Sequence, residues 1–247
     1  MGKLGKYISL TFLLSWTCWG FGIFMGDNIT GIIKVIVYIG YISPACSAIV
    51  CLDDEIKSIQ DLKSFLFHHK KNTFWIFSIF VFLLILNFSI NSKSLSYILR
   101  FSKIPPTVYI VIIFLSTTFF GSGLEEIGWR GVMQPELEKR FSPIVTSLII
   151  APIWAVWHLP LWFLEGTSQH GSSFLSFFVM VLLLTFCFGA IRRKTESVFY
   201  CMIFHGLYNT LVGVFPIKDK IDIFWGLLLM AIIGILMMSN KKLSIKR

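Results

Sequence analysis

Eight apolar runs, each close to the roughly 20 residues that a helix needs to cross a bilayer core, constrain this chain more than any other feature. Hydrophobic residues make up 55% of the 247 residues, and the mean hydropathy of +0.76 is far above that of a soluble domain. We therefore expect an all-α, polytopic membrane protein, with residues 1–247 forming a single transmembrane domain of about eight helices. The predicted spans are Tyr7–Met25, Ile29–Leu52, Thr73–Ile90, Thr107–Leu124, Pro143–Phe163, Phe174–Ile191, Val198–Phe215 and Ile221–Ser239.

The net charge of +9 comes from short basic clusters between the apolar runs, a pattern typical of cytoplasmic loops that face anionic lipid. It favours membrane lipids over nucleic acid as a partner. One set of alternate loops holds fifteen basic residues, namely Lys3, Lys6, Lys57, Lys63, Lys70, Lys71, Lys139, Arg140, Arg192, Arg193, Lys194, Lys241, Lys242, Lys246 and Arg247. The other set holds five, namely Lys93, Arg100, Lys103, Lys218 and Lys220. This asymmetry predicts that both termini lie in the cytoplasm.

The first apolar run is predicted to be a retained span. Tyr7–Met25 is too long and too aromatic for the core of a signal peptide, and it lacks a small-x-small cleavage site. The cysteines fall in or beside apolar segments without a CxxC spacing, so we interpret them as small buried hydrophobic residues rather than as disulfides or metal ligands. They are Cys18, Cys46, Cys51, Cys187 and Cys201.

Two connecting segments carry a helical pattern of their own. Asp53–Asn72 places Ile56, Ile59, Leu62, Phe65 and Leu66 at the spacing of one helix face, with lysines around them. This segment predicts an amphipathic helix that lies at the membrane surface. Ser94–Lys103 predicts a second surface helix on the opposite side, ended by Pro105 and Pro106.

The fourth apolar run ends in charged residues, where Glu125 and Glu126 are followed by Arg130. A charge at the bilayer centre costs about 2.5–3.5 kcal/mol on insertion scales, so this group needs a partner, a wet cavity or a function. Glu126 and Arg130 are four residues apart and share a helix face, so they can form an ion pair. Glu125 points about 100° away from that face and stays available as a base.

Two later spans carry histidines. His158 stands just before Pro160, which disfavours helix at the preceding residue and predicts a helix break next to the imidazole. His205 and Asn209 share a helix face in the seventh span, where their N–H groups can hold an oxyanion.

Each of these three features has a structural explanation when taken alone. A lone intramembrane histidine is more often a hydrogen-bonded core residue than a catalyst, and a Glu–Arg pair near a helix end can be an interfacial salt bridge. Buried Glu and His can also form the proton relay of a transporter, although the chain shows no inverted repeat to support one. Together, however, the three features supply the base, the second imidazole and the anion donors that a hydrolase needs.

The ordered motifs resemble those of the CAAX protease and bacteriocin-processing family of intramembrane proteases, also called the Abi family. The series is Glu125-Glu126-x-x-x-Arg130, then Trp154-x-x-x-His158, then His205-x-x-x-Asn209. The motifs cover roughly Gly121–Thr210, within a predicted protease core at about 107–215. Trp154 departs from the family, which more often has phenylalanine at this place.

The resemblance implies an intramembrane endopeptidase with its active site inside the helical bundle. By this resemblance Glu125 is the general base that activates water together with His158, and Glu126 pairs with Arg130 and orients its neighbours. His205 and Asn209 are then expected to stabilise the tetrahedral oxyanion. No cofactor is required by the sequence, which has no HExxH motif. A divalent metal such as zinc, held by Glu125, His158 and His205, stays an open alternative.

The resemblance leaves the substrate open. It is expected to be a membrane-associated or lipidated protein, or a bacteriocin-type leader peptide, in the plasma membrane of a bacterium. The alternative is a non-catalytic role in bacteriocin self-immunity or as a membrane scaffold. The oligomeric state is also undetermined by the sequence.

The predicted spans place Glu125 near the cytoplasmic end of the fourth helix and His158 about 15 residues, or roughly 22 Å, into the fifth. A shared site therefore requires two changes. We predict that the fourth helix continues through Arg130 toward Glu136. We also predict that the fifth helix begins later than Pro143 or starts outside the bilayer.

Overall fold

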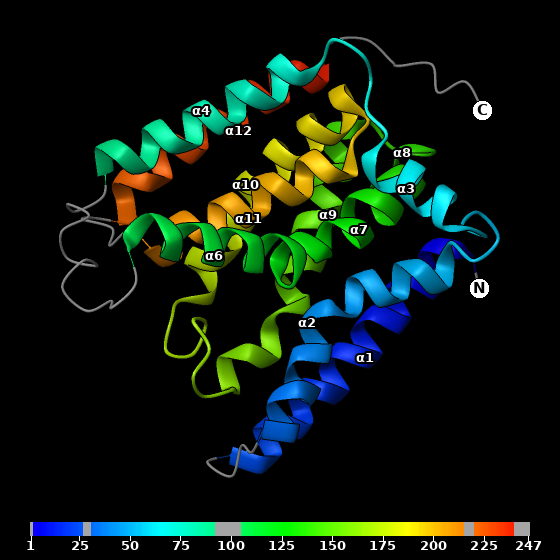
Figure 1. The fold of residues 1–247 in the computed structure, drawn as a ribbon, viewed down its shortest axis with the longest axis vertical. Coiled ribbons are helices and arrows are strands. Elements are labelled where there is room, and N and C mark those ends of the chain that lie inside the picture. The colour runs from blue at the N-terminus through cyan, green and yellow to red at the C-terminus, as the bar shows by residue number, and fades with distance from the viewer. Residues whose placement is uncertain (1, 27–30, 92–104, 215–219, 240–247) are drawn as a thin grey trace.

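A computed structural model describes residues 2–26, 31–91, 105–214 and 220–239, and every regular element in these ranges is a helix (Figure 1). The long helices are α1 (Lys3–Met25), α2 (Gly31–Cys51), α4 (Phe74–Asn91), α6 (Pro106–Phe119), α9 (Pro143–Trp157), α10 (Phe174–Thr195), α11 (Val198–Val214) and α12 (Lys220–Ser239). The short helices are α3 (Ile59–Phe67), η2 (Ser122–Leu124), α7 (Glu125–Gly128), η3 (Trp129–Met133), α8 (Gln134–Glu138) and η4 (Leu159–Phe163).

The prediction of a polytopic all-α membrane protein is confirmed. Within the described ranges, five helical stretches are long and apolar enough to cross a bilayer, namely Lys3–Met25, Gly31–Cys51, Pro106–Glu138, Pro143–Phe163 and Phe174–Thr195. Three shorter apolar helices, Phe74–Ile90, Val198–Val214 and Ile223–Ser239, coincide with the remaining predicted spans. The boundary of the fourth span was wrong, because this stretch continues to Glu138 rather than ending at Leu124.

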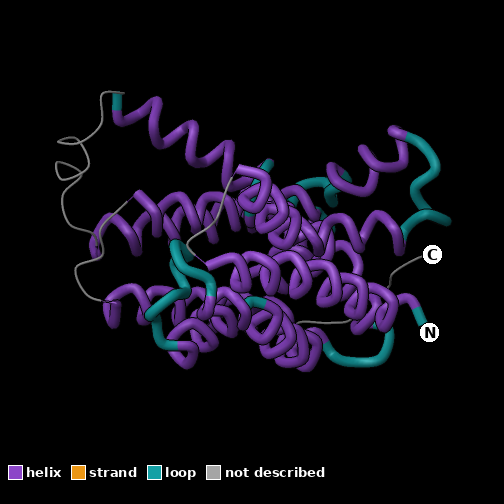
Figure 2. Tube along the Cα trace, turned by 90° about the horizontal axis from the view of Figure 1, so that it is seen from below, coloured by secondary structure: helices purple, strands orange, loops and turns teal. Residues whose placement is uncertain are grey.

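The helices pack as neighbouring pairs around a shared interior. α1 packs along α2, α12 packs against both α4 and α10, and α6 runs along α11 (Figure 1). Figure 2 shows the described residues from below as helices joined by loops. α9 and α10 are also neighbours, and the short helices η2, α7 and η3 lie among α2, α6, α10 and α11. Large aromatic side chains fill the interior, among them the fully buried Trp19, Trp129, Trp157, Phe188 and Phe204.

The distribution of polarity is that of a protein surrounded by lipid. Leucine, isoleucine, phenylalanine and tryptophan side chains stand exposed on the outer faces of the helices, for example Leu13, Phe24, Ile32, Phe82 and Trp225. The interior instead contains buried charged and hydroxyl side chains. In a bilayer an apolar side chain gains nothing by burial, whereas a polar one needs partners inside the protein.

The predicted amphipathic helix in Asp53–Asn72 is shorter than expected. α3 begins after Ser58, whose hydroxyl accepts the amide of Asp61 at 3.1 Å and donates to its carboxylate at 2.8 Å. This bond to Ser58 holds the pKa of the Asp61 carboxyl below its usual value. Phe65 packs against η3 at Gly131, but Ile59 is exposed and does not belong to the packed face. The second predicted surface helix, Ser94–Lys103, lies outside the described residues.

α11 approaches α6 closely at Gly206. A Cβ atom on Gly206 would lie 1.9 Å from the hydroxyl of Thr118 and 2.9 Å from its Cα, so only glycine fits this contact. Two hydroxyl groups, those of Thr117 and Thr210, donate to the carbonyl of Gly206 at 3.0 and 2.6 Å. The close approach therefore fixes the position of the residue before it, His205.

The substitution Gly206→Ala is expected to push α11 away from α6, because the obstructing atoms include the Thr118 backbone. Overpacking of this kind costs about 1–3 kcal/mol, so we expect a lower melting temperature in detergent micelles. The matched control is Gly213→Ala, in the same helix, where an added Cβ meets nothing within 4 Å. That variant should unfold at or above the wild-type temperature. Equal stability of the two variants would contradict the close approach.

Candidate active site

The two carboxylates sit at the start of a helical run that resumes inside the protein. After α6 ends at Phe119, η2 turns the chain, and the run from Glu125 to Glu138 is helical throughout. Gly123 makes the turn possible, since a Cβ there would lie 2.2 Å from the carbonyl oxygen of Thr118. The predicted continuation through Arg130 toward Glu136 is thus confirmed, although Trp129–Met133 is π-helical. π-Helical turns inside α-helices often occur at functional sites.

The fifth span begins at Pro143, with the Ser142 hydroxyl accepting the amide of Val145 at 3.4 Å. The expectation of a later start was wrong, because this serine and the following proline already form a helix N-terminus. That the start of this helix lies outside the bilayer stays a prediction. Glu125 lies within the helical stretch Pro106–Glu138 rather than at its end. This placement reduces the difference in membrane depth between Glu125 and His158 that the predicted spans implied.

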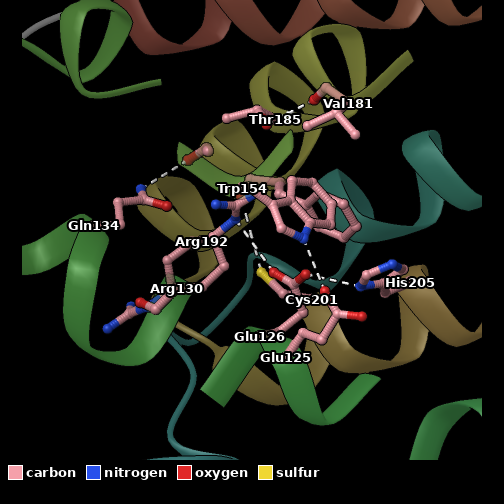
Figure 3. Close-up of polar contacts among 12 residues, drawn as sticks. Glu125, Glu126, Arg130, Gln134, Trp154, Val181, Thr185, Arg192, Cys201 and His205 are labelled. Atoms are coloured by element: carbon pink, nitrogen blue, oxygen red, sulfur yellow. Dashed lines mark hydrogen bonds and ion pairs between the residues drawn. The ribbon is translucent and has the colours of Figure 1, made fainter. Parts of the chain in front are cut away.

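Glu126 is fully buried and has two charged or polar partners. One carboxylate oxygen lies 3.2 Å from Nε of Arg130, the ion pair expected from their spacing, and both side chains are 0% exposed. The other oxygen lies 2.8 Å from Nδ1 of His205 on α11. Figure 3 shows these contacts between the helical run and α11. Glu126 therefore connects its own helix to the histidine of the seventh span.

The Arg130 guanidinium is enclosed by aromatic rings. Its Cζ atom lies 4.9 Å from the ring centroid of Phe188 and 5.5 Å from that of Trp154, distances at which a desolvated cation–π contact is favourable. Nη1 and Nη2 make no hydrogen bond to a described residue. The backbone carbonyl of Arg130 accepts a hydrogen bond of 3.1 Å from Nε of Arg192. The rings and Glu126 together compensate the buried charge.

Glu125 is 4% exposed and forms no ion pair with a residue that the structure describes. Its Oε2 atom accepts a hydrogen bond of 2.8 Å from the indole Nε1–H of Trp154 on α9 (Figure 3). Trp129 also interacts with this carboxylate, but its indole N–H forms no hydrogen bond of normal geometry with a described residue. The division expected from the sequence is therefore present, with Glu126 paired to a cation and Glu125 held by a neutral donor.

His158 occupies the end of α9, where the predicted break before Pro160 is confirmed: α9 ends at Trp157 and η4 follows. Its Nδ1 lies 2.9 Å from the carbonyl oxygen of Trp154. Because a carbonyl can only accept, Nδ1 carries the proton, and a neutral His158 has its lone pair on Nε2. The ring packs against Trp157 and Phe177 and is 7% exposed.

His205 and Asn209 lie on one face of α11, but they have different surroundings. His205 is 4% exposed and packs against the rings of Trp154 and Phe188, with centroid distances of 5.4 and 5.2 Å. Asn209 is half-buried, and its amide makes no hydrogen bond to any residue in the described ranges. The structure thus brings Glu125, Glu126, Arg130 and His205 together with His158 around Trp154, while Asn209 stands one turn away.

Three residues of this cluster were not foreseen from the sequence. Trp154 was noted only as an exchange for phenylalanine, yet its N–H donates to Glu125. Phe188 gave no signal within an apolar run. Arg192 was assigned to a cytoplasmic loop, but it lies within α10 and donates to Arg130.

The residues that a metal ion would need do not come together. In the described ranges, no three His, Cys, Asp or Glu side chains gather closely enough to hold a metal ion. Each candidate ligand contacts a different part of Trp154. Glu125 accepts from its indole N–H, His158 lies at its backbone carbonyl, and His205 packs against its ring. As placed, they do not fit a three-ligand zinc site.

Comparison with known proteins agrees with this geometry. Residues 107–211 match the family profile of the Rce1-like type II CAAX prenyl endopeptidases. A protein named CAAX prenyl protease 2, from Methanococcus maripaludis, is 27% identical over 113 residues, which is 42% of this chain and 40% of that protein. Residues 107–211 are therefore similar to the CAAX protease family.

The segment that matches the CAAX protease family includes every residue of the cluster. It begins at the start of α6 and ends in α11, so α1 to α4 and α12 lie outside the match. The chain spans less than half the length of the curated relative. The family assignment therefore covers the helices that carry Glu125, His158 and His205, and it supports a peptidase.

The substitution Arg130→Gln removes the cation from a fully buried pair. Because the loss of one partner of such a pair costs about 3–5 kcal/mol, we expect a strongly lowered melting temperature in detergent or loss of the folded protein. The matched control is Lys139→Gln, which breaks the exposed pair with Glu136 three residues away. Exposed pairs contribute little, so this control should melt like the wild type. Similar losses in both variants would show that Arg130 has no special structural role.

Proposed function

We propose that this protein is an intramembrane endopeptidase that hydrolyses a peptide bond with a water activated by Glu125 and His158. The observation that carries the proposal is the placement of both groups on Trp154. Its indole holds the carboxylate at 2.8 Å and its carbonyl holds the imidazole at 2.9 Å. A buried carboxylate without an ion pair and an imidazole with a free lone pair, each hydrogen-bonded to Trp154, are suited to general-base chemistry.

In the proposed reaction, the water loses a proton to Glu125 as its oxygen adds to the peptide carbonyl. The carbonyl π electrons move to oxygen and form a tetrahedral oxyanion. When the intermediate collapses, the C–N bond breaks and the proton held by Glu125 passes to the leaving amine. His158 orients the water by accepting its second hydrogen at Nε2. Water is thus the only co-reactant that the step consumes.

His205 and Asn209 are the proposed oxyanion donors. Since Nδ1 of His205 contacts Glu126, the ring atom left to donate toward the oxyanion is Nε2. The N–H groups of the Asn209 amide are not engaged by other described residues and can donate as well. Glu126 therefore orients His205 and contributes no proton to the substrate.

The proposed substrates are membrane-associated or lipidated proteins. The matched relative is named for a prenylated C-terminal CAAX sequence, and this substrate class is proposed for the present chain by similarity. The proposed location is the plasma membrane of a bacterium, with both termini in the cytoplasm, as the distribution of basic residues indicates.

Replacing Glu125 by Gln, or His158 by Ala, is expected to abolish cleavage, because each change removes a proton acceptor from the attacking water. The measurement compares the membrane peptidomes of cells that contain wild-type protein and each variant, so that cleavage is detected on whichever membrane protein is the substrate. Peptides that depend on the wild type should disappear in both variants. The matched control is Glu165→Gln, which neutralises an exposed carboxylate and should leave the peptidome unchanged.

An unchanged peptidome in Glu125→Gln would contradict the proposed chemistry. If that variant also still protected cells against a bacteriocin, a non-catalytic immunity role would replace the proposal. Both outcomes require that the variant be present in the membrane at wild-type amounts, which immunoblotting measures.

A further inference from the structure

Trp154 makes a contact with Glu125 that a residue present only for packing would not make. Its indole N–H donates to Oε2 at 2.8 Å, and the two side chains are 2% and 4% exposed. A hydrogen bond to an ionised acceptor is about twice as strong as one between neutral groups, and low-dielectric surroundings strengthen it further. The contact joins α9 to the start of α7.

The surrounding residues leave the Trp154 side chain little freedom. Its ring lies against the guanidinium of Arg130 at 5.5 Å and against the ring of Phe188 at 5.9 Å. The His205 ring packs edge-on at 5.4 Å, with an interplanar angle of 86°. A side chain fixed on these sides holds its N–H in one direction, so the bond restricts rotation of the Glu125 carboxylate.

The two oxygens of Glu125 therefore differ. Oε2 accepts the indole N–H of Trp154, whereas Oε1 forms no hydrogen bond of normal geometry with a described side chain, the nearby indole of Trp129 included. A general base needs one oxygen directed at its proton, and a displacement of about 1 Å can cost on the order of 100-fold in rate. The same residue also positions His158 through its carbonyl oxygen at 2.9 Å.

We infer that Trp154 is a positioning residue for the reaction, which fixes the Glu125 carboxylate through its indole N–H and leaves Oε1 to accept the proton of water. The inference rests on the proposed peptidase function. It assigns to the N–H group a role that a phenylalanine ring at this place cannot perform, while the ring contacts to Arg130 and Phe188 serve the fold.

The decisive variants remove the N–H and keep an aromatic ring. Trp154→Phe does so with a smaller ring, and replacement of Trp154 by 3-benzothienylalanine does so with a sulfur atom at the N–H position and almost unchanged shape. The substrate is a fluorescence-quenched peptide that ends in a farnesylated CAAX sequence, and the full chain is measured in detergent micelles. We expect kcat to fall about 10- to 100-fold in both variants with KM changed less than about 3-fold.

The matched control is Trp19→Phe. Trp19 is also fully buried and its indole donates to a backbone carbonyl, that of Val37, at 3.1 Å. This variant loses the same ring volume and a hydrogen bond, but it does not touch Glu125. A kcat within about 2-fold of the wild type is expected for it. The inference is overturned by a benzothienylalanine protein with wild-type kcat, or by an effect confined to KM.

An NMR measurement tests the contact without any activity. In protein labelled with ¹⁵N-tryptophan, the indole signal of Trp154 is identified by its absence from Trp154→Phe. This signal should shift in Glu125→Gln, while the Trp19 indole signal stays in place. An unchanged Trp154 signal overturns the inference. If the wild type cleaves neither the probe nor any membrane peptide, the proposed function fails and the positioning role falls with it, whereas the NMR shift still shows whether the contact exists.

Discussion

The buried carboxylate of Glu126 is the group on which the arrangement of the interior depends. A desolvated charge of this kind costs several kcal/mol unless it is both paired and hydrogen-bonded. Glu126 meets both conditions with Arg130 from its own helix and His205 from α11. Because the partners come from two elements, a shift of α11 would break the contact of Glu126 with His205 and leave this buried carboxylate with Arg130 alone. The close approach at Gly206 makes the necessary distance possible.

Most of the fold could be predicted from the sequence because a bilayer allows few alternatives. Backbone groups in lipid must be satisfied within each segment, so every long apolar run becomes a helix. The errors arose where local side chains altered a boundary. Ser58 begins α3 later than the apolar spacing implied. Ser142 begins α9 at Pro143, as the apolar run predicts and earlier than the comparison of membrane depths required. The fourth helix extends beyond Leu124 because pairing inside the protein lets charged residues continue a span.

The site was predictable as far as its contacts are local in the chain. The pair of Glu126 with Arg130 follows from helical spacing, and the helix break at His158 follows from Pro160. The contacts of Glu126 with His205, 79 residues away, and of Trp154 with Glu125, 29 residues away, depend on how helices pack. A sequence also cannot show that Phe188 covers a guanidinium, since its position within an apolar run looks like any other.

The two glutamates illustrate how packing gives adjacent identical residues different chemistry. They are separated by one helical step of about 100°, so their side chains meet different neighbours. Glu126 faces a cation and an imidazole, one at each of its oxygens. Glu125 faces the edge of the Trp154 indole, whose N–H donates to one of its two oxygens. One acid of the pair is neutralised and supports the fold, while the other retains an oxygen that can accept a proton. Acid–base catalysis by neighbouring carboxylates requires such a difference between the two groups. The rotation of about 100° between the two residues around the helix axis therefore determines which carboxylate can act on water.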